Sequence, residues 1–303
     1  MSAPAPDESL PFTGERFVPG AKGEIWMEHW HRYHFAARWA KGRAVVDVAC
    51  GEGYGSALLA RCAAHVTGID VSEQAIAHAE RAYAATPNLR FVRGSCEALP
   101  LADACADLAV SFETVEHIQA QERFLDELAR VLRPAGTLVL SCPNKVEYSD
   151  KRNHVNEFHV RELYRDELAA LVGRRFPHVR WYGQRPTFYS VIAPESGDDA
   201  RAQLVEVDEA CPQEAAPALS QPLYFLLVAS RDAAALEAVA PALSVLADRG
   251  DWIYRDYEKV YRGMVDASRR ADALEQQLAK RNGWPAWLRR LFSLPLGGGP
   301  GRG

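Results

Sequence analysis

The sequence lacks three features, and each absence excludes a class of protein. Its six cysteines contain no C-x-x-C pair, which predicts small buried side chains in a protein of a reducing compartment. No apolar run is long enough to span a bilayer, and residues 1–10 are acidic and proline-rich, so we expect a cytoplasmic protein rather than an exported one. The formal charge of -5 lacks the basic excess of a general nucleic-acid binder, and we expect no nucleic-acid partner.

A glycine-rich loop directly after an apolar run is the most informative feature that is present. Residues 45–48 predict a buried parallel strand, and alternating glycines follow as Gly51, Gly53 and Gly55. Glycine lets a backbone approach a ligand where a Cβ would collide. Asp70 ends the next apolar run, where its carboxylate can accept hydrogen bonds from both hydroxyls of a ribose. This layout predicts a site for a nucleoside-bearing cofactor.

Two cofactor classes share such a layout, and the spacing separates them. A dinucleotide fingerprint needs G-x-G-x-x-G, whereas the third glycine here falls two residues after the second. Asp47 would also set a carboxylate near a pyrophosphate, but it would attract the ammonium group of an amino acid. S-adenosylmethionine carries such a group. We therefore favour this cofactor over a nicotinamide dinucleotide.

The loop resembles the first motif, D-x-G-C-G-x-G, of the class I S-adenosylmethionine-dependent methyltransferases, with Ala49 in place of the usual first glycine. Ser95 stands where that family usually has aspartate, and its hydroxyl can still hydrogen-bond the amine of adenine. The resemblance implies a set of cofactor-binding residues: Asp47, Ala49, Gly51, Gly53, Tyr54, Asp70, Val71, Ser95, Cys96, Glu97 and Ser111.

Strand and helix patterns alternate along the chain. We expect strands at residues 45–48, 65–70, 89–93, 107–112, 137–142, 179–183 and 223–229, and helices at 25–40, 56–62, 72–85, 121–132 and 161–172. This order predicts an α/β fold with a Rossmann-like seven-stranded methyltransferase sheet, whose last strand is antiparallel and lies at the edge. The aromatic-rich helix at 25–40 is expected to form a lid over the cofactor.

Four regions follow from these patterns. They are an N-terminal segment with the lid helix (1–40), a methyltransferase domain (41–250) with a mobile excursion (194–222), a coiled-coil-like helix (251–282), and a basic aromatic segment with a glycine-rich tail (283–303).

Apolar residues from Ile253 to Leu278 recur at alternating spacings of four and three residues, the pattern of a coiled coil, which predicts a homo-oligomer. The alternative is one amphipathic helix that lies on the core. Tryptophans beside arginines at 284–292 suit peripheral contact with the inner face of a membrane or with a glycan-assembly complex, or simple docking of a helix.

Carboxylates and imidazoles gather after the fourth expected strand. Glu113, Glu116 and His117 stand at positions i, i+3 and i+4, so one helical turn would bring them to one face as a site for Mg²⁺ or Mn²⁺. This E-x-x-E-H pattern resembles that of small-RNA 2′-O-methyltransferases, whose metal chelates the vicinal hydroxyls of a ribose. Alternatively, the two glutamates are surface or helix-capping residues and His117 alone is functional, as a general base or substrate contact.

Two further histidines follow the fifth expected strand. His154 and His159 would return to the same edge of the sheet, where either completes the metal shell or takes the proton of an acceptor hydroxyl. The candidate catalytic residues are therefore His117, His154 and His159. The candidate metal ligands are Glu113, Glu116, His117 and His154.

Further segments of the sequence resemble those of bacterial methyltransferases of surface-polysaccharide biosynthesis, including those that cap O-antigen chains. These segments are residues 13–19, 28–36, 111–117 and 148–150. The resemblance implies an O-methyltransferase whose acceptor is a sugar hydroxyl, at the terminal residue of a surface polysaccharide. Two alternatives stay open. One is a small-molecule O-methyltransferase acting on a phenol, a quinone precursor or a secondary metabolite, and the other is a catalytically weak scaffold for glycan assembly.

Overall fold

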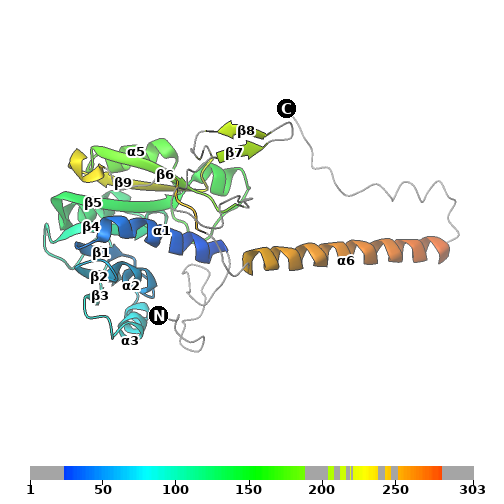
Figure 1. Cartoon of the computed structure of the whole chain (residues 1–303), viewed down its shortest axis with the longest axis horizontal. Helices are drawn as coiled ribbons and strands as arrows, with labels where there is room; N and C mark the ends of the chain where they lie inside the picture. Colours follow the sequence, from blue (N-terminus) through cyan, green and yellow to red (C-terminus); the bar gives the residue numbers. More distant parts are fainter. Residues whose placement is uncertain are drawn as a thin grey trace, which may run out of the picture. The chain divides into compact units, whose positions relative to one another are not determined.

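The computed structural model describes residues 24–187, 204–207, 212–215, 219, 221–237, 243–246 and 252–281 (Figure 1). The chain divides into two units, Met1–Leu246 and Ala247–Gly303. Four subjects of the sequence predictions lie outside the described residues: the segment 13–19, Cys211, most of the expected excursion at 194–222, and the basic aromatic segment at 283–303.

A seven-stranded sheet forms the centre of the first unit, in the order β3-β2-β1-β4-β5-β9-β6. Its strands are β1 (Ala44–Val48), β2 (His65–Asp70), β3 (Leu89–Arg93), β4 (Ala106–Phe112), β5 (Leu132–Pro143), β6 (His178–Gln184) and β9 (Tyr224–Ser230). The pairs from β3 to β5 are parallel, and β9 is antiparallel to both β5 and β6. The predicted Rossmann-like sheet with an antiparallel last strand is confirmed.

The expected edge position of that last strand is wrong. β9 lies between β5 and β6, so β6 is the edge strand. All seven residues of β9 are buried, whereas β6 is only partly covered and exposes Arg180. A strand that is apolar on both faces gains most from an interior position, which explains the order.

Helices cover both faces of the sheet. They are α1 (Glu24–Ala40), α2 (Tyr54–Ala60), α3 (Glu73–Ala82), α4 (Gln121–Val131) and α5 (Arg165–Gly173), with short turns η1 (Val115–His117), η2 (Val146–Asp150) and η3 (Ala233–Leu236). Ser72 caps α3 as expected, since its Oγ accepts from the backbone N–H of Ala75 at 3.2 Å. α5 begins four residues later than predicted, because the Glu167 carboxylate accepts from the N–H of Tyr164, the residue before the helix, at 2.9 Å.

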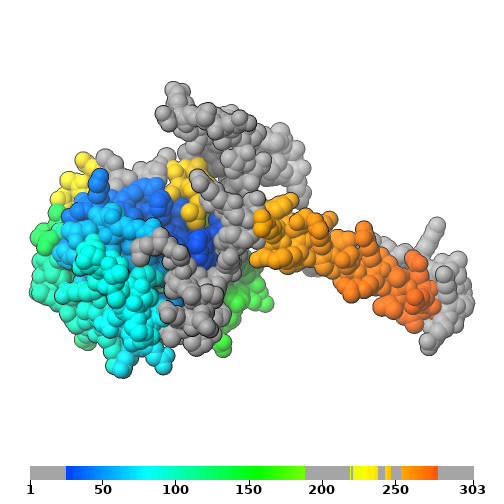
Figure 2. All heavy atoms as spheres, turned by 60° about the horizontal axis from the view of Figure 1, so that its bottom comes forward, coloured from blue at the N-terminus to red at the C-terminus, as the bar shows by residue number. Residues whose placement is uncertain are grey.

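The helix expected as a lid is part of the core over its second half. Phe35, Ala36 and Trp39 of α1 are buried in one hydrophobic cluster with residues of β1, β4 and β9. In Figure 2 the blue atoms of α1 lie against the lighter blue and cyan atoms of the segment that follows it in the chain. α4 and α5 contribute to a second cluster that includes other residues of the same strands. Only the first half of α1 is therefore placed to cover a ligand.

Two smaller features complete the described structure. β7 (Leu204–Val207) and β8 (Pro212–Ala215) pair antiparallel within the expected excursion. The second unit contains α6 (Trp252–Arg281), 30 residues long, as the periodic pattern predicted. None of the described helices combines the length and apolar composition needed to cross a bilayer.

Candidate active site

The glycine loop connects β1 to α2 and turns through left-handed backbone. Ala49, Gly51 and Gly53 have φ angles of 62°, 55° and 81°. A Cβ at Gly53 would lie 2.5 Å from the Phe91 ring, so this position requires glycine for space as well as for conformation. Ala49 adopts the same left-handed conformation, which the usual glycine would adopt readily. Because alanine has a Cβ, this conformation costs conformational free energy at Ala49. The loop lies at the carboxyl ends of β1 and β2, where Gly51 is partly exposed and Gly53 is buried.

Asp47 lies beneath this loop and is fully buried. Its two carboxylate oxygens accept hydrogen bonds from Tyr33 Oη at 3.1 Å and from Ser56 Oγ at 2.6 Å. Burial raises the pKa of Asp47 to about 7, against the lowering effect of these two hydrogen bonds; the charge of Asp70 raises it further. Asp47 thus links α1, β1 and α2, and its proposed contact with the cofactor's ammonium group stays a prediction.

Asp70 is the partly exposed carboxylate at the mouth of the loop. One of its oxygens accepts from the backbone N–H of Gly51 at 2.9 Å, and the other accepts from that of Ser72 at 2.8 Å. Each oxygen keeps a lone pair for a further donor, so two hydroxyl groups of a ribose have acceptors here. Val71, beside it, is 68% exposed and offers an apolar surface.

The residues expected to bind adenine make contacts within the protein. Ser95 Oγ accepts from the N–H of Glu97 at 3.1 Å, and Cys96 packs against the core, where burial raises the pKa of its thiol to about 11. Ser111 is buried, and its hydroxyl donates to the Val48 carbonyl at 2.9 Å. Its position favours a role in tying β4 to β1 over direct contact with a cofactor.

A second group lies at the carboxyl end of β4. Ligand atoms of Glu116, His117 and His159 all lie within 4.8 Å of one another. The Glu116 side chain is 1% exposed, and neither carboxylate oxygen has a hydrogen-bond partner among the described residues. Burial and the charge of Glu113 raise the pKa of Glu116 well above its usual range. We call these three residues the Glu116 cluster.

Both imidazoles of the cluster are held through Nδ1. His117 Nδ1 is 2.9 Å from the Phe158 carbonyl, which can only accept, so Nδ1 carries the proton and Nε2 the lone pair. That Nε2 lies 3.9 Å from Glu116 Oε1. His159 Nδ1 is 2.5 Å from a Glu162 carboxylate oxygen, and burial lowers the pKa of this imidazole. Tyr148 stacks on the His159 ring with centroids 5.5 Å apart.

Glu113 and His154, both expected at the metal, lie outside this cluster. Glu113 has a left-handed φ of 50°, and the short helix begins only at Val115, so the expected helical turn does not form. Its carboxylate accepts from Ser141 Oγ at 2.6 Å and lies 3.5 Å from a guanidinium nitrogen of Arg32. His154 is exposed, and its ring contacts that of Tyr148.

Arg32 of α1 is a central residue that the sequence reasoning missed. It is 1% exposed, donates from Nε to Gln184 on β6 at 2.6 Å, and lies 4.3 Å above the Tyr224 ring on β9. The Tyr224 hydroxyl in turn donates to Glu28 at 3.0 Å. The available signal was the i, i+4 spacing of Glu28 and Arg32 within the apolar stripe of α1, since charged residues enter such a stripe when they are paired.

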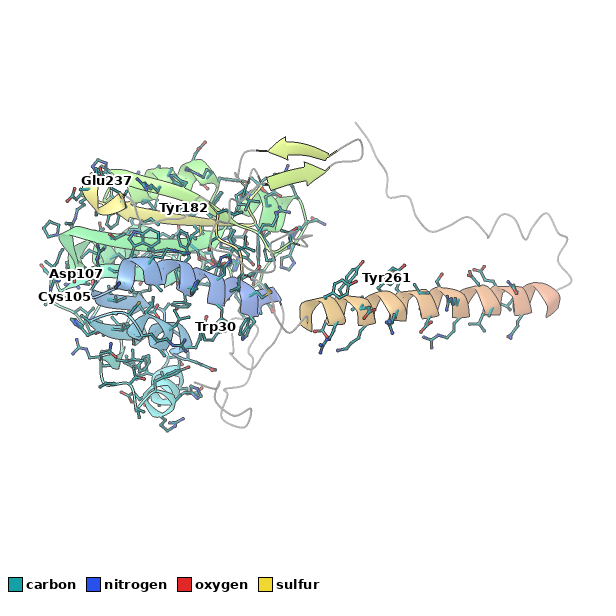
Figure 3. All side chains as sticks on the ribbon, in the orientation of Figure 1. Trp30, Cys105, Asp107, Tyr182, Glu237 and Tyr261 are labelled. Atoms are coloured by element: carbon teal, nitrogen blue, oxygen red, sulfur yellow. The ribbon has the colours of Figure 1, made fainter. Side chains whose placement is uncertain are left out.

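Two of the side chains labelled in Figure 3, Asp107 and Trp30, lie toward opposite ends of the sheet. Asp107 stands at the amino end of β4, where it accepts from the N–H of Ala44, and Trp30 of α1 stands at the opposite end. Trp30 packs on Tyr54 of the glycine loop with ring centroids 5.4 Å apart. The Tyr54 hydroxyl is 2.8 Å from His29 Nδ1. The first half of α1 therefore borders the loop at the carboxyl end of the sheet, where ligands of this fold bind.

Comparison with known proteins finds similarity to methyltransferases. Residues 46–140 match a family model described as a methyltransferase domain. A probable S-adenosylmethionine-dependent methyltransferase of Mycolicibacterium smegmatis is 40% identical over 167 residues, which cover 54% of this chain and 64% of that protein. Phthiotriol/phenolphthiotriol dimycocerosates methyltransferase 1 of Mycobacterium ulcerans is 33% identical over 160 residues, 48% of this chain and 56% of that protein.

Two further matches are shorter or more distant. Malonyl-[acyl-carrier protein] O-methyltransferase of Pectobacterium atrosepticum is 35% identical over 100 residues, 33% of this chain and 38% of that protein. The YcgJ protein of Bacillus subtilis superimposes with a TM-score of 0.47 at 17% identity, covering 67% of this chain and 100% of that one. The chain spans about three fifths of the length of the first curated relatives that it matches.

Proposed function

We propose that the core of this chain is a class I S-adenosylmethionine-dependent methyltransferase domain and that it methylates a hydroxyl group. The acceptor that we propose is a sugar hydroxyl at the terminal residue of a bacterial surface polysaccharide. The observation that carries the proposal is the pairing of two sites at one edge of the sheet. The glycine loop and Asp70 follow β1 and β2, and the Glu116 cluster follows the neighbouring β4.

The residues of the first site fit the cofactor. Gly51 is partly exposed and has no Cβ to hinder the approach of a ligand, and the two Asp70 oxygens each keep a lone pair for a ribose hydroxyl. Bound S-adenosylmethionine supplies an activated methyl group. The protein has to align the acceptor oxygen with that methyl group and exclude competing water, because orientation provides much of the rate in such a displacement.

For a metal-free reaction, we propose that His117 is the general base that takes the proton of the acceptor hydroxyl. The Phe158 carbonyl fixes its Nδ1 proton, so Nε2 presents its lone pair on the side of Glu116. A positioned base of this kind contributes roughly 10²- to 10⁴-fold to the rate. Tyr148, stacked on His159, offers an aromatic surface beside the cluster on which the ring of an acceptor can pack.

A hydroxyl-bearing lipid is the second candidate acceptor. The observation that favours it is the name of the Mycobacterium ulcerans relative, which describes a triol substrate. Initial rates on defined glycans, on long-chain triols and on phenols separate the sugar, lipid and small-molecule proposals, since each predicts a different preferred series.

Calorimetric titration of the full chain with S-adenosylhomocysteine tests the first site. We expect saturable binding at one site that Asp70→Asn weakens by roughly 10- to 100-fold, because hydrogen bonds to a charged group contribute about 1.5–3 kcal/mol. Glu73→Gln is the matched control, since this carboxylate is 77% exposed and pairs with Arg93. Saturable binding of NADH without binding of S-adenosylhomocysteine would instead support a dehydrogenase.

Helix α6 supports a proposal on partners. Tyr257, Val260, Met264 and Leu274 of its predicted seam are each at least half exposed. In a parallel pair of such helices, Arg270 would lie opposite Glu275 of a second copy, a favourable charge pair beside the seam. We therefore propose homo-oligomerisation through α6. Peripheral membrane contact or a glycan-assembly partner stays a prediction from residues 283–303, and cytoplasmic location stays one from composition.

A further inference from the structure

The Glu116 cluster is assembled by backbone hydrogen bonds between two distant segments. Glu116 and His117 belong to η1, and His159 comes from the segment before α5. The N–H groups of Val160 and Arg161 both donate to the Glu116 carbonyl, at 2.8 and 3.0 Å. His159 is thereby fixed beside Glu116, whereas His154 is not, so the cluster is a built feature of the fold.

Its two imidazoles are oriented as metal ligands are oriented in proteins. A ligating histidine almost always directs its other ring nitrogen to a carbonyl or a carboxylate, which fixes the tautomer and the plane of the ring. Here Phe158 provides the carbonyl for His117 and Glu162 provides the carboxylate for His159. His117 Nε2 is then left for a further partner, whereas His159 Nε2 accepts a hydrogen bond from Asn156 Nδ2 at 3.0 Å, which a bound cation would replace.

Negative charge exceeds positive charge around the cluster in the described part of the chain. Among the described residues no donor bonds either buried Glu116 oxygen, and a buried carboxylate is costly unless it is paired or coordinates a metal. Glu113 and Glu162 add two more carboxylates. The cation Arg32 acts on Glu116 and lies against Glu113. A divalent cation at the cluster would offset the remaining negative charge and give the Glu116 oxygens a partner.

We propose that Glu116, His117 and His159 bind a divalent transition-metal cation such as Zn²⁺, Fe²⁺ or Mn²⁺. Two imidazole nitrogens and one carboxylate oxygen suit these ions, whereas Mg²⁺ prefers oxygen ligands. This proposal replaces Glu113 and His154 of the expected ligand set with His159, and it keeps Mn²⁺ but not Mg²⁺ among the candidate metals. Three protein ligands leave coordination positions open for a small molecule.

The role of the cation rests on the proposed function, although its binding does not. With the ion present, the His117 lone pair is a ligand, and an acceptor hydroxyl coordinated at an open position has a lowered pKa. Its proton then leaves to water as the oxygen is aligned for methylation. A vicinal diol would occupy two open positions, which agrees with a sugar acceptor.

The test is a titration of the metal-free full chain, without a histidine tag, with Co²⁺, whose visible absorption reports coordination. We expect one equivalent to bind and Zn²⁺ to displace it. Glu116→Gln and His159→Asn should each weaken Co²⁺ binding by more than about 100-fold, and Glu162→Gln, which orients His159, by roughly 10- to 100-fold. His154→Asn is the matched control and should stay within about threefold of the parent, because it removes a histidine of the same segment that lies outside the cluster.

Each outcome decides the proposal. Absence of stoichiometric Co²⁺ binding, equal binding by Glu116→Gln, or displacement of Co²⁺ by an equal concentration of Mg²⁺ would overturn it. Titration of every variant with S-adenosylhomocysteine monitors folding and separates the two claims. Cofactor binding without Co²⁺ binding removes the metal alone, whereas Co²⁺ binding without cofactor binding removes the proposed function and leaves the metal site.

Discussion

Replacing Asp47 with asparagine should change how the stability of the protein depends on pH. The folded state raises the pKa of this buried carboxyl group from 3.8 to about 7, so the folded protein holds a proton that the unfolded chain releases. The resulting stabilisation is complete below about pH 4 and is lost as the pH rises through about 7. Between pH 5 and pH 8 the wild-type protein should lose roughly 2.5 kcal/mol relative to a variant that cannot ionise.

Urea unfolding at a series of pH values measures this effect. Asp47→Asn also alters the hydrogen bonds with Tyr33 and Ser56, which adds an offset, so the informative quantity is the slope of the difference from wild type. Asp107→Asn is the control. Its carboxyl pKa is lowered from 3.8, and its difference from wild type should stay flat over the same range. Parallel stability curves for wild type and Asp47→Asn would refute the reasoning.

Three further substitutions test the local structure. Ala49→Gly should raise the free energy of unfolding by about 1 kcal/mol in denaturant titrations, because φ at this position is 62°; an unchanged or lower value would contradict the left-handed turn. Gly55→Ala should lower the free energy of unfolding by roughly 1–3 kcal/mol in the same titrations, since the new Cβ would lie 2.0 Å from the Tyr33 ring. Wild-type stability of this variant would contradict the close packing of Tyr33 on Gly55. Met264→Glu should shift the protein from oligomer to monomer in sedimentation equilibrium, since it places a charge in the α6 seam; an unchanged mass would remove the proposed seam.

The order of strands and helices was predictable because each element is encoded locally. The apolar run at 65–69 forms β2, and Ser72 caps the following helix as its position indicates. The position of the antiparallel strand was not predicted correctly, because neighbours in a sheet are chosen by contacts far apart in the chain. The apolar residues Phe225 to Ala229 of β9 were a usable local signal for an interior strand.

The second site shows where local spacing fails. Positions i, i+3 and i+4 predict one helical face, but contacts with Arg32 and Ser141, 81 and 28 residues away, hold the Glu113 side chain apart from its neighbours. The choice of His159 over His154 depends on backbone bonds to Glu116 across about 40 residues of chain. No short-range pattern contains this information, whereas the glycine loop and Asp70 belong to one βαβ unit and lie in hydrogen-bond contact.

The most direct test of the central claim is transfer of a ¹³C-labelled methyl group from S-adenosylmethionine to fractionated envelope glycans and lipids, followed by NMR of the product. We expect a new O-methyl signal in the glycan fraction, and at limiting S-adenosylmethionine this signal should decrease when Asp70→Asn replaces the wild-type protein. A label on nitrogen or carbon, or no transfer by a protein that binds S-adenosylhomocysteine, would contradict it.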